Sequence, residues 1–184
     1  MKYTVQHIQQ RFNEQEKLRF LFFWKHLPSN DGNITKSCFS QWFEIDFVID
    51  NQVYKTAEHW MMAEKARIFN DEEIRQKILT VHHPHEAKQL GRAVKNFNPA
   101  IWDAHKFEIV VKGNYHKFSQ HEALKLFLLN TKNRILAEAS PRDKVWGIGM
   151  SENDENVRNP NLWKGQNLLG FALMKVRERL KEEK

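Results

Sequence analysis

Residues 56–69 read TAEHWMMAEKARIF, and this stretch predicts the helix on which the rest of the fold is built. Thr56 is a plausible N-cap, because a threonine hydroxyl can accept a backbone N–H of the first turn. Apolar side chains then recur at the three- and four-residue spacing of one helix face, at Ala57, Trp60, Met61 and Ile68. A helix, and not a strand, is therefore expected at this point of the chain.

The same helix carries an acid and a base on one side. Glu58 and Lys65 are separated by about 20° around the helix and by about 10 Å along its axis. Both are expected at the margin of the apolar stripe. A carboxylate there could act as a general acid or base, and a partly desolvated lysine could act as a nucleophile. The helix alone leaves open the alternative of two surface charges whose aliphatic stems cover the edge of the core.

Helical patterns dominate the segments on either side, and the expected strands are few. Helices are expected at 4–17, from Asp71, at 85–94, from Asn98–Pro99 through residue 118, at 120–130 and at 166–181. Strands are expected at 18–26, 39–50, 52–54 and 135–139, and loops at 28–36, 141–149 and 150–165. Because the strands mostly do not alternate with helices, the sequence predicts an α+β fold. One compact domain over residues 1–184 is expected, with residues 1–17 as an N-terminal extension of a core at about 18–181.

The composition is that of a folded protein without disulfide bonds. The chain has 184 residues, of which 41% are hydrophobic and 28% charged, and Cys38 is its one cysteine. A single cysteine excludes an intramolecular disulfide and a cysteine-based zinc site. No apolar run approaches the ~18 residues of a membrane span, and the first residues lack the apolar core of an export signal. These features predict a cytoplasmic protein.

The positive charge is concentrated in the second half of the chain. Residues 93–184 hold 16 basic and 11 acidic residues, whereas residues 1–92 hold 13 and 12. A basic excess attracts anionic partners such as nucleotides or nucleic acid, although the same charge also keeps a protein soluble. The candidate phosphate partners are Arg92, Lys95, Lys106, Lys112 and Lys117. A charged helical face that contacts only water is the alternative.

Two further motifs are weak signs of a site. The HHPH stretch at residues 82–85 lacks the i, i+4 spacing of a metal-binding pair, so solvated imidazoles at a helix start are expected, with no metal site and no cofactor. Gly147 and Gly149 are not part of a dinucleotide-binding fingerprint. Beside Trp146 they either let the backbone approach a phosphate or ribose closely or form a tight turn.

Taken in order, several segments of the chain resemble the NADAR family, which is named for a proposed link to NAD and ADP-ribose. These segments are FFW (22–24), FSQW (39–42), AEHWMMAEKA (57–66), LGRAV (90–94), Trp102 with KF (117–118), ILAEASPRDKVWGIG (135–149) and WKGQNLLGFALMKVRERL (163–180). Their ordered set is specific, although each segment alone is weak. The resemblance implies a small α+β domain rich in helices, and it favours a site at Glu58 and Lys65 over two surface charges. Gln41 stands where many relatives carry Asn, and the 150–162 loop is longer than in compact bacterial forms, so the choice of substrate stays open.

The motifs of the family fall on particular residues of this chain. EHxxxxxK falls on Glu58, His59 and Lys65, GR on Gly91 and Arg92, SPxDxxWGxG on residues 140–149, and GxNxLG on residues 165–170. The resemblance implies that Glu58, Lys65 and Asp143 are catalytic, with Lys117 as a rival to Lys65. The substrate-binding residues that it implies are His59, Arg92, Trp102, Lys106, Lys117, Trp146, Gly147 and Asn167, with tryptophans stacking on a base and cations neutralising phosphates.

The resemblance also implies an enzyme that hydrolyses N-glycosidic bonds of ribosyl phosphates. The first candidate substrate is ADP-ribose linked to the amino group of guanine in nucleic acid, with a DNA ADP-ribosyltransferase toxin as a genetic partner. The second is a ribosylamino-pyrimidine phosphate of riboflavin synthesis, and a third reading is a non-catalytic module that binds ADP-ribose or NAD. Cleavage needs protonation of the leaving nitrogen, by Glu58 or Asp143, and Lys65 could form a Schiff base with the ring-opened ribose.

Overall fold

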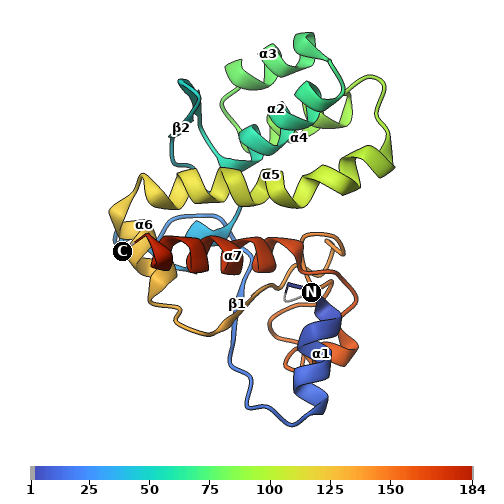
Figure 1. Ribbon diagram of the computed structural model, residues 1–184. Helices are drawn as coiled ribbons and strands as arrows, with labels where there is room; N and C mark the ends of the chain where they lie inside the picture. Colours follow the sequence, from blue (N-terminus) through green and yellow to red (C-terminus); the bar gives the residue numbers. More distant parts are fainter. Residues whose placement is uncertain (1–2, 184) are drawn as a thin grey trace. The chain divides into compact units, whose positions relative to one another are not determined.

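The computed structural model describes residues 3–183, which are grouped in two compact units (Figure 1). One unit is continuous in sequence and runs over Gln41–Glu122, and the other combines Met1–Ser40 with Ala123–Lys184. Helices make up most of the regular structure, and the strands have only three or four residues. The α+β class predicted from the sequence is confirmed, whereas the single domain over residues 1–184 stays a prediction.

A short hairpin forms the only strand pair in the described part of the 41–122 unit. In it, β2 (Phe47–Ile49) pairs antiparallel with β3 (Gln52–Tyr54). Asp50 and Asn51 connect the two strands with φ angles of 51° and 63°. Positive φ at both turn residues is the backbone of a two-residue turn that matches the twist of a hairpin, and Asn and Asp tolerate it well. The return strand predicted at residues 52–54 is therefore confirmed.

Three helices follow the hairpin and pack on one another, as Figure 1 shows: α2 (Ala57–Ile68), α3 (Glu72–Thr80) and α4 (Pro84–Arg92). Thr56 and Asp71 cap α2 and α3, as predicted. The side chain of each accepts a backbone N–H three residues further on, at 3.3 and 3.2 Å respectively. These caps satisfy backbone donors that have no partner inside the helix, and so they fix where both helices begin.

The longest helix of the unit is α5 (Pro99–Ser119), which packs against α2. A Cβ at Gly113 would lie 2.2 Å from Cδ1 of Trp60, so the two helices approach closely only because residue 113 has no side chain. The indole Nε1 of Trp60 donates to the carbonyl of Ile109 at 2.7 Å. Trp60 is 2% exposed and belongs to the core.

The other unit is built around a parallel pair of strands that lie far apart in sequence. Strand β1 (Phe20–Phe23) pairs with β4 (Ile135–Glu138), and α7 (Leu168–Glu182) packs on β4. At Gly170 a Cβ would lie 2.1 Å from the carbonyl oxygen of Leu136. The glycine therefore lets the first turn of α7 contact the backbone of β4 directly.

The remaining elements of this unit are α1 (Val5–Asn13), the 3₁₀ helices η1 (Lys36–Phe39) and η2 (Pro160–Leu162), and α6 (Glu122–Leu129), which begins at its boundary. Helix α1, blue in Figure 1, lies beside the orange segment that contains η2. No helix within residues 3–183 is long and apolar enough to cross a membrane.

The strand predicted over residues 39–50 is wrong up to residue 46. Phe39 ends η1, and residues 40–46 form turns and irregular backbone. Phe39 and Phe43 are buried, so the alternation of apolar residues reflects aromatic side chains that turn into the core rather than a strand. Only residues 47–49 have a partner strand, and only they form a β ladder.

Candidate active site

The first turn of α2 carries Glu58 and His59 into the interior of the 41–122 unit. Glu58 is 3% exposed and His59 is 2% exposed. The sequence places Glu58 at the margin of the core, and it lies deeper than that because α3, α4 and α5 all pack on α2. With three helices around it, α2 buries most of its circumference rather than a single stripe.

The backbone at the start of α2 is held by a buried polar network. The N–H of Glu58 donates to the carbonyl of Gln41 at 3.0 Å. The Gln41 side chain accepts from Nδ2 of Asn114 at 2.7 Å, and Asn114, on α5, is fully buried. Paired amides of this kind fix an orientation, because a broken partner leaves a buried polar group unsatisfied. The network positions Glu58, and Asn114 is a residue that the sequence reading missed, although a polar side chain among the apolar residues of a helix could have indicated it.

His59 takes part in the cap of α2. Its Nδ1 lies 2.8 Å from Oγ1 of Thr56, the residue that caps the helix. Burial lowers the pKa of His59, because a charged imidazole is disfavoured away from water. The geometry gives His59 a structural task, and the substrate-binding role implied by the resemblance stays a prediction.

Lys65 is the centre of a half-buried group on the last turn of α2. Its Nζ donates to the carbonyl of Gly91 at 2.7 Å and lies 4.1 Å from the ring centroid of Phe97 and 6.0 Å from that of Trp102. Burial lowers the pKa of Lys65, and the positive charge of Arg92 lowers it further. A lysine with a lowered pKa carries more free amine at neutral pH, which is the form that attacks a carbonyl or imine carbon.

Phe97 is part of this group and was not singled out by sequence reasoning. It is 42% exposed, and its ring meets that of Phe69 edge to face at 5.3 Å. It directly precedes Asn98, the residue that caps α5 and accepts the N–H of Ala100 at 2.9 Å. An aromatic residue immediately before a helix cap is the only signal that the sequence offers for it. Next to Lys65, the exposed ring provides a flat apolar surface of the kind on which bases stack.

The other cations predicted in this unit differ in how accessible they are. Arg92 is exposed, and Nζ of Lys106 pairs with Asp103 at 2.6 Å. Lys117 is fully buried, with its ammonium 5.4 Å from the ring centroids of Phe43 and Phe118. The prediction that Lys117 contacts a phosphate is therefore not met by this structure, in which a phosphate cannot reach it. For the same reason, the half-buried Lys65 is the better placed of the two candidate nucleophiles.

In the other unit, Asp143 shapes the loop that follows β4. Its Oδ1 accepts the backbone N–H groups of Val145 and Trp146 at 2.8 and 2.7 Å. A Cβ at Gly147 would lie 2.8 Å from a carbonyl oxygen of β4, so this glycine lets the loop return against the strand. Trp146 is half-buried on the same loop. These contacts describe a tight turn, and the catalytic role of Asp143 and the substrate contacts of the loop stay predictions.

Asn167 connects this loop with β4 and the start of α7. It is fully buried with a φ of 54°, and its N–H donates to the carbonyl of Gly147 at 3.0 Å. Its Nδ2 donates to the carbonyl of Leu136 at 2.9 Å, and its Oδ1 accepts the N–H of Glu138 at 3.0 Å. The side-chain amide thus extends the hydrogen bonding of β4, which is a structural role. The substrate-binding role implied for Asn167 stays a prediction.

We expect Asn167→Ala to lower the free energy of unfolding in urea by about 2–4 kcal/mol, because two buried backbone groups lose their partners at about 1–3 kcal/mol each. Asn161→Ala, in the exposed 3₁₀ helix nearby, should change it by less than about 1 kcal/mol, since surface side chains contribute little. If Asn167→Ala were as stable as the wild type but bound substrate more weakly, the residue would belong to substrate binding instead.

The residues predicted to form the site thus fall in two groups, one in each unit. The group around Lys65 in the 41–122 unit brings together Arg92, Trp102 and Phe97 through the contacts of one ammonium. The group on residues 143–167 in the other unit is joined by backbone and amide hydrogen bonds. Chemically, the first group offers an amine, an exposed guanidinium and two aromatic rings.

The HHPH stretch at residues 82–85 begins α4, as expected. Its three imidazole side chains are exposed, and the N–H of His83 donates to Oε2 of Glu86 at 3.2 Å. Within residues 3–183, no three His, Cys, Asp or Glu side chains are gathered closely enough to hold a metal ion. The prediction of solvated imidazoles at a helix start is confirmed.

Comparison with known proteins assigns this arrangement to a family. The NADAR domain matches residues 22–181. An N-glycosidase of Acanthamoeba polyphaga mimivirus is 47% identical over 145 residues, which are 76% of this chain and 85% of the viral protein. The N-glycosidase YbiA of Escherichia coli is 33% identical over 136 residues, covering 74% of this chain and 76% of YbiA. The NMR structure of E. coli YbiA matches with a TM-score of 0.71 and 29% identity, over 90% of this chain and 86% of that one.

These similarities define a hydrolase that acts on N-glycosyl bonds. The chain belongs to the NADAR family. The resemblance drawn from the ordered motifs of the sequence is thereby confirmed.

Proposed function

We propose that the chain removes ADP-ribose from the amino group of guanine in nucleic acid by hydrolysing the N-glycosidic bond. The observation that carries this proposal is the environment of Lys65. Its half-buried amine has a lowered pKa and is flanked by Phe97, Trp102 and the exposed Arg92. An amine, flat rings and a guanidinium match a ribosyl carbon, a purine base and a diphosphate, respectively.

The chemistry that we propose uses Lys65 as the nucleophile and Glu58 as the acid and base. A ribose that carries an exocyclic amine opens to an imine at its anomeric carbon. The Lys65 amine adds to that carbon, Glu58 protonates the leaving nitrogen of guanine, and the C–N bond to guanine breaks. Water, which gives a proton to Glu58, then hydrolyses the lysine imine and releases ADP-ribose and free lysine. Protons and bonds balance, and no oxidant or reductant is needed.

The choice of substrate rests on charge. A nucleic acid is polyanionic, and residues 93–184 carry the basic excess of the chain. The alternative substrate, a ribosylamino-pyrimidine phosphate of riboflavin synthesis, has the same type of bond but one small anionic group. A DNA ADP-ribosyltransferase as genetic partner and a cytoplasmic location complete the proposal and rest on the sequence alone.

Direct product analysis tests the substrate. The protein is incubated with DNA that carries ADP-ribosyl guanine, and separately with a ribosylamino-pyrimidine phosphate, and products are separated by chromatography and mass spectrometry. Release of free ADP-ribose with restored guanine is the expected result. Release of ribose phosphate from the pyrimidine alone would move the function to the small substrate, and tight binding without product from either would make the chain a binding module.

A further inference from the structure

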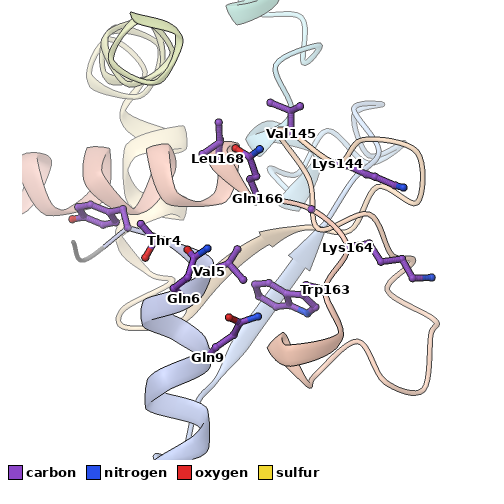
Figure 2. Close-up of a pocket in the computed structure, with 12 residues that line it drawn as sticks. Thr4, Val5, Gln6, Gln9, Lys144, Val145, Trp163, Lys164, Gln166 and Leu168 are labelled. Carbon is purple, nitrogen blue, oxygen red and sulfur yellow. The ribbon is translucent and has the colours of Figure 1, made fainter. Parts of the chain in front are cut away.

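The described structure contains a pocket that the candidate active site does not use. It has a volume of about 610 Å³ and lies in the unit that contains α1 and α7, as Figure 2 shows. Pockets of roughly 300–1,000 Å³ are the usual size for small-molecule ligands. Helix α1 forms one wall, and the segments 144–145 and 163–168 form the others. The NADAR domain match begins at residue 22, so the α1 wall lies outside the part of the chain that defines the family.

Helix α1 is fixed in place by specific contacts. Ile8 is fully buried, and Nε2 of Gln9 donates to the carbonyl of Pro160 at 3.1 Å. At the far end of the helix, Nδ2 of Asn161 donates to Oδ1 of Asn13 at 2.8 Å. A wall that is anchored by core burial and at two hydrogen-bonded points keeps its shape without a ligand.

The two loop segments opposite α1 are tied together by their backbones. The N–H of Gln166 donates to the carbonyl of Lys144, and that of Lys164 donates to Ile148, both at 2.9 Å. A Cβ at Gly165 would lie 2.3 Å from the carbonyl oxygen of Gly147, so only glycine permits this close approach. The pocket is therefore largely formed in advance, which reduces the entropy cost of binding.

The lining of the pocket is positive and carries no acidic side chain. Lys144 and Lys164 contribute two exposed cations, and neither forms an ion pair with a described residue. Three glutamine side chains, Gln6, Gln9 and Gln166, add amide groups. Elsewhere in the described chain, exposed lysines such as Lys77 and Lys95 pair with carboxylates. Two cations left without carboxylates, beside amide donors, are suited to an anion with several oxygen acceptors.

The pocket also has an apolar side. Val5, Val145, Leu168 and Trp163 line it, and Figure 2 shows the Trp163 ring below Val5. The indole Nε1 of Trp163 donates to the carbonyl of Val157 at 2.7 Å, which fixes the ring. A ligand that satisfies both sides has a flat apolar group and phosphate oxygens.

We infer that this pocket binds a free nucleotide, with its phosphates between Lys144 and Lys164 and its base against the apolar side. The inference does not depend on the proposed glycosidase mechanism, because none of the residues assigned to catalysis lines the pocket. The loop that carries Asp143 and Trp146 also supplies Lys144 and Val145. An occupied pocket therefore holds the same loop on which predicted site residues lie.

Isothermal titration of the full chain with ADP and with adenosine tests the inference. We expect ADP to bind and adenosine to bind at least tenfold more weakly, because adenosine lacks phosphates. The double variant K144Q/K164Q should weaken ADP at least tenfold and leave adenosine unchanged. Gln166→Glu, which adds one negative charge without a change of shape, should weaken ADP in the same direction. The control K17Q/K25Q removes two exposed lysines that do not line the pocket and should bind ADP like the wild type.

Three outcomes would overturn the inference: no ADP binding to the wild type at millimolar concentration, ADP binding that K144Q/K164Q leaves unchanged, or an equal loss in K17Q/K25Q. Binding of a single-stranded oligonucleotide through these lysines, without binding of ADP, would also overturn it, in favour of a nucleic-acid contact. Glu58→Gln should bind ADP here like the wild type even if it is inactive. The fate of the proposed function and that of the pocket can thus be told apart.

Discussion

Glu58→Gln should leave the protein folded and lower the rate of N-glycoside hydrolysis by about 10²–10⁴, the usual contribution of a positioned general acid or base. The amide has the shape of the carboxylate but can neither donate its proton to the leaving nitrogen nor accept one from water. The backbone network of Gln41 and Asn114 contacts the N–H of Glu58 and not its carboxylate, so the start of α2 should be retained. The rate is measured as release of ADP-ribose, and folding as the melting temperature.

Glu64→Gln is the matched control for this variant. Glu64 lies on the same helix, and its carboxylate pairs with Arg67 at 2.9 Å. The same chemical change there should lower the rate by less than about twofold, because a surface ion pair contributes only about 0–1 kcal/mol and is remote from the proposed chemistry. Full activity of Glu58→Gln would discard the acid and base assignment.

The second large effect concerns Lys65. Lys65→Ala should lower the rate by a similar or larger factor, because the variant has no amine to form the imine. Borohydride added during turnover should trap a covalent adduct on the wild-type chain, and mass spectrometry should place it on Lys65. Lys95→Ala, an exposed lysine paired with Glu73, should still give the adduct. No adduct in the wild type, or an adduct that persists in Lys65→Ala, would refute the Schiff base.

The pH dependence follows from the same lysine. Attack requires the unprotonated amine, so kcat should rise with pH through the pKa of Lys65, which burial and Arg92 hold below its ordinary value of 10.5. Arg92→Gln removes one positive neighbour, so the pKa of Lys65 rises and the ascending limb of kcat should move to higher pH. An unchanged limb would show that Lys65 does not titrate in the rate-limiting step.

Local signals predicted the helices of this protein well. Thr56, Asp71 and Asn98 each cap a helix because a short polar side chain placed before an apolar pattern has one favourable use. The Asp50–Asn51 turn was equally readable, since both residues tolerate a positive φ. In these places the conformation depends on neighbours within three or four residues.

Properties that depend on distant partners were not predictable. The FSQWF segment alternates like a strand, but strand formation needs a neighbour, and only residues 47–49 have one. Glu58 appears at the margin of a helical stripe, but its burial is decided by three helices that arrive later in the chain. Phe97 gives no sign in sequence that it covers Lys65, because that contact joins a loop to another helix.

The motifs identified the right family, but they did not separate chemistry from architecture. Asp143 and Asn167 stand in two conserved-looking patterns and serve as hydrogen-bond anchors of a loop and a strand. A polar residue in such a motif is compatible with either task, since the same carboxylate or amide can bind backbone or ligand. Only the partners seen in the structure distinguish the two.

The pairing of β1 with β4 also has a consequence for the order of events during synthesis. At about 5–20 residues per second, the ribosome delivers β4 roughly ten seconds after β1. The 41–122 unit is complete in between, whereas Phe20–Phe23 waits without its partner and with a row of open backbone groups. For that interval the nascent chain presents an aromatic strand edge to its surroundings, which makes this short segment the part of the newborn protein most in need of a chaperone.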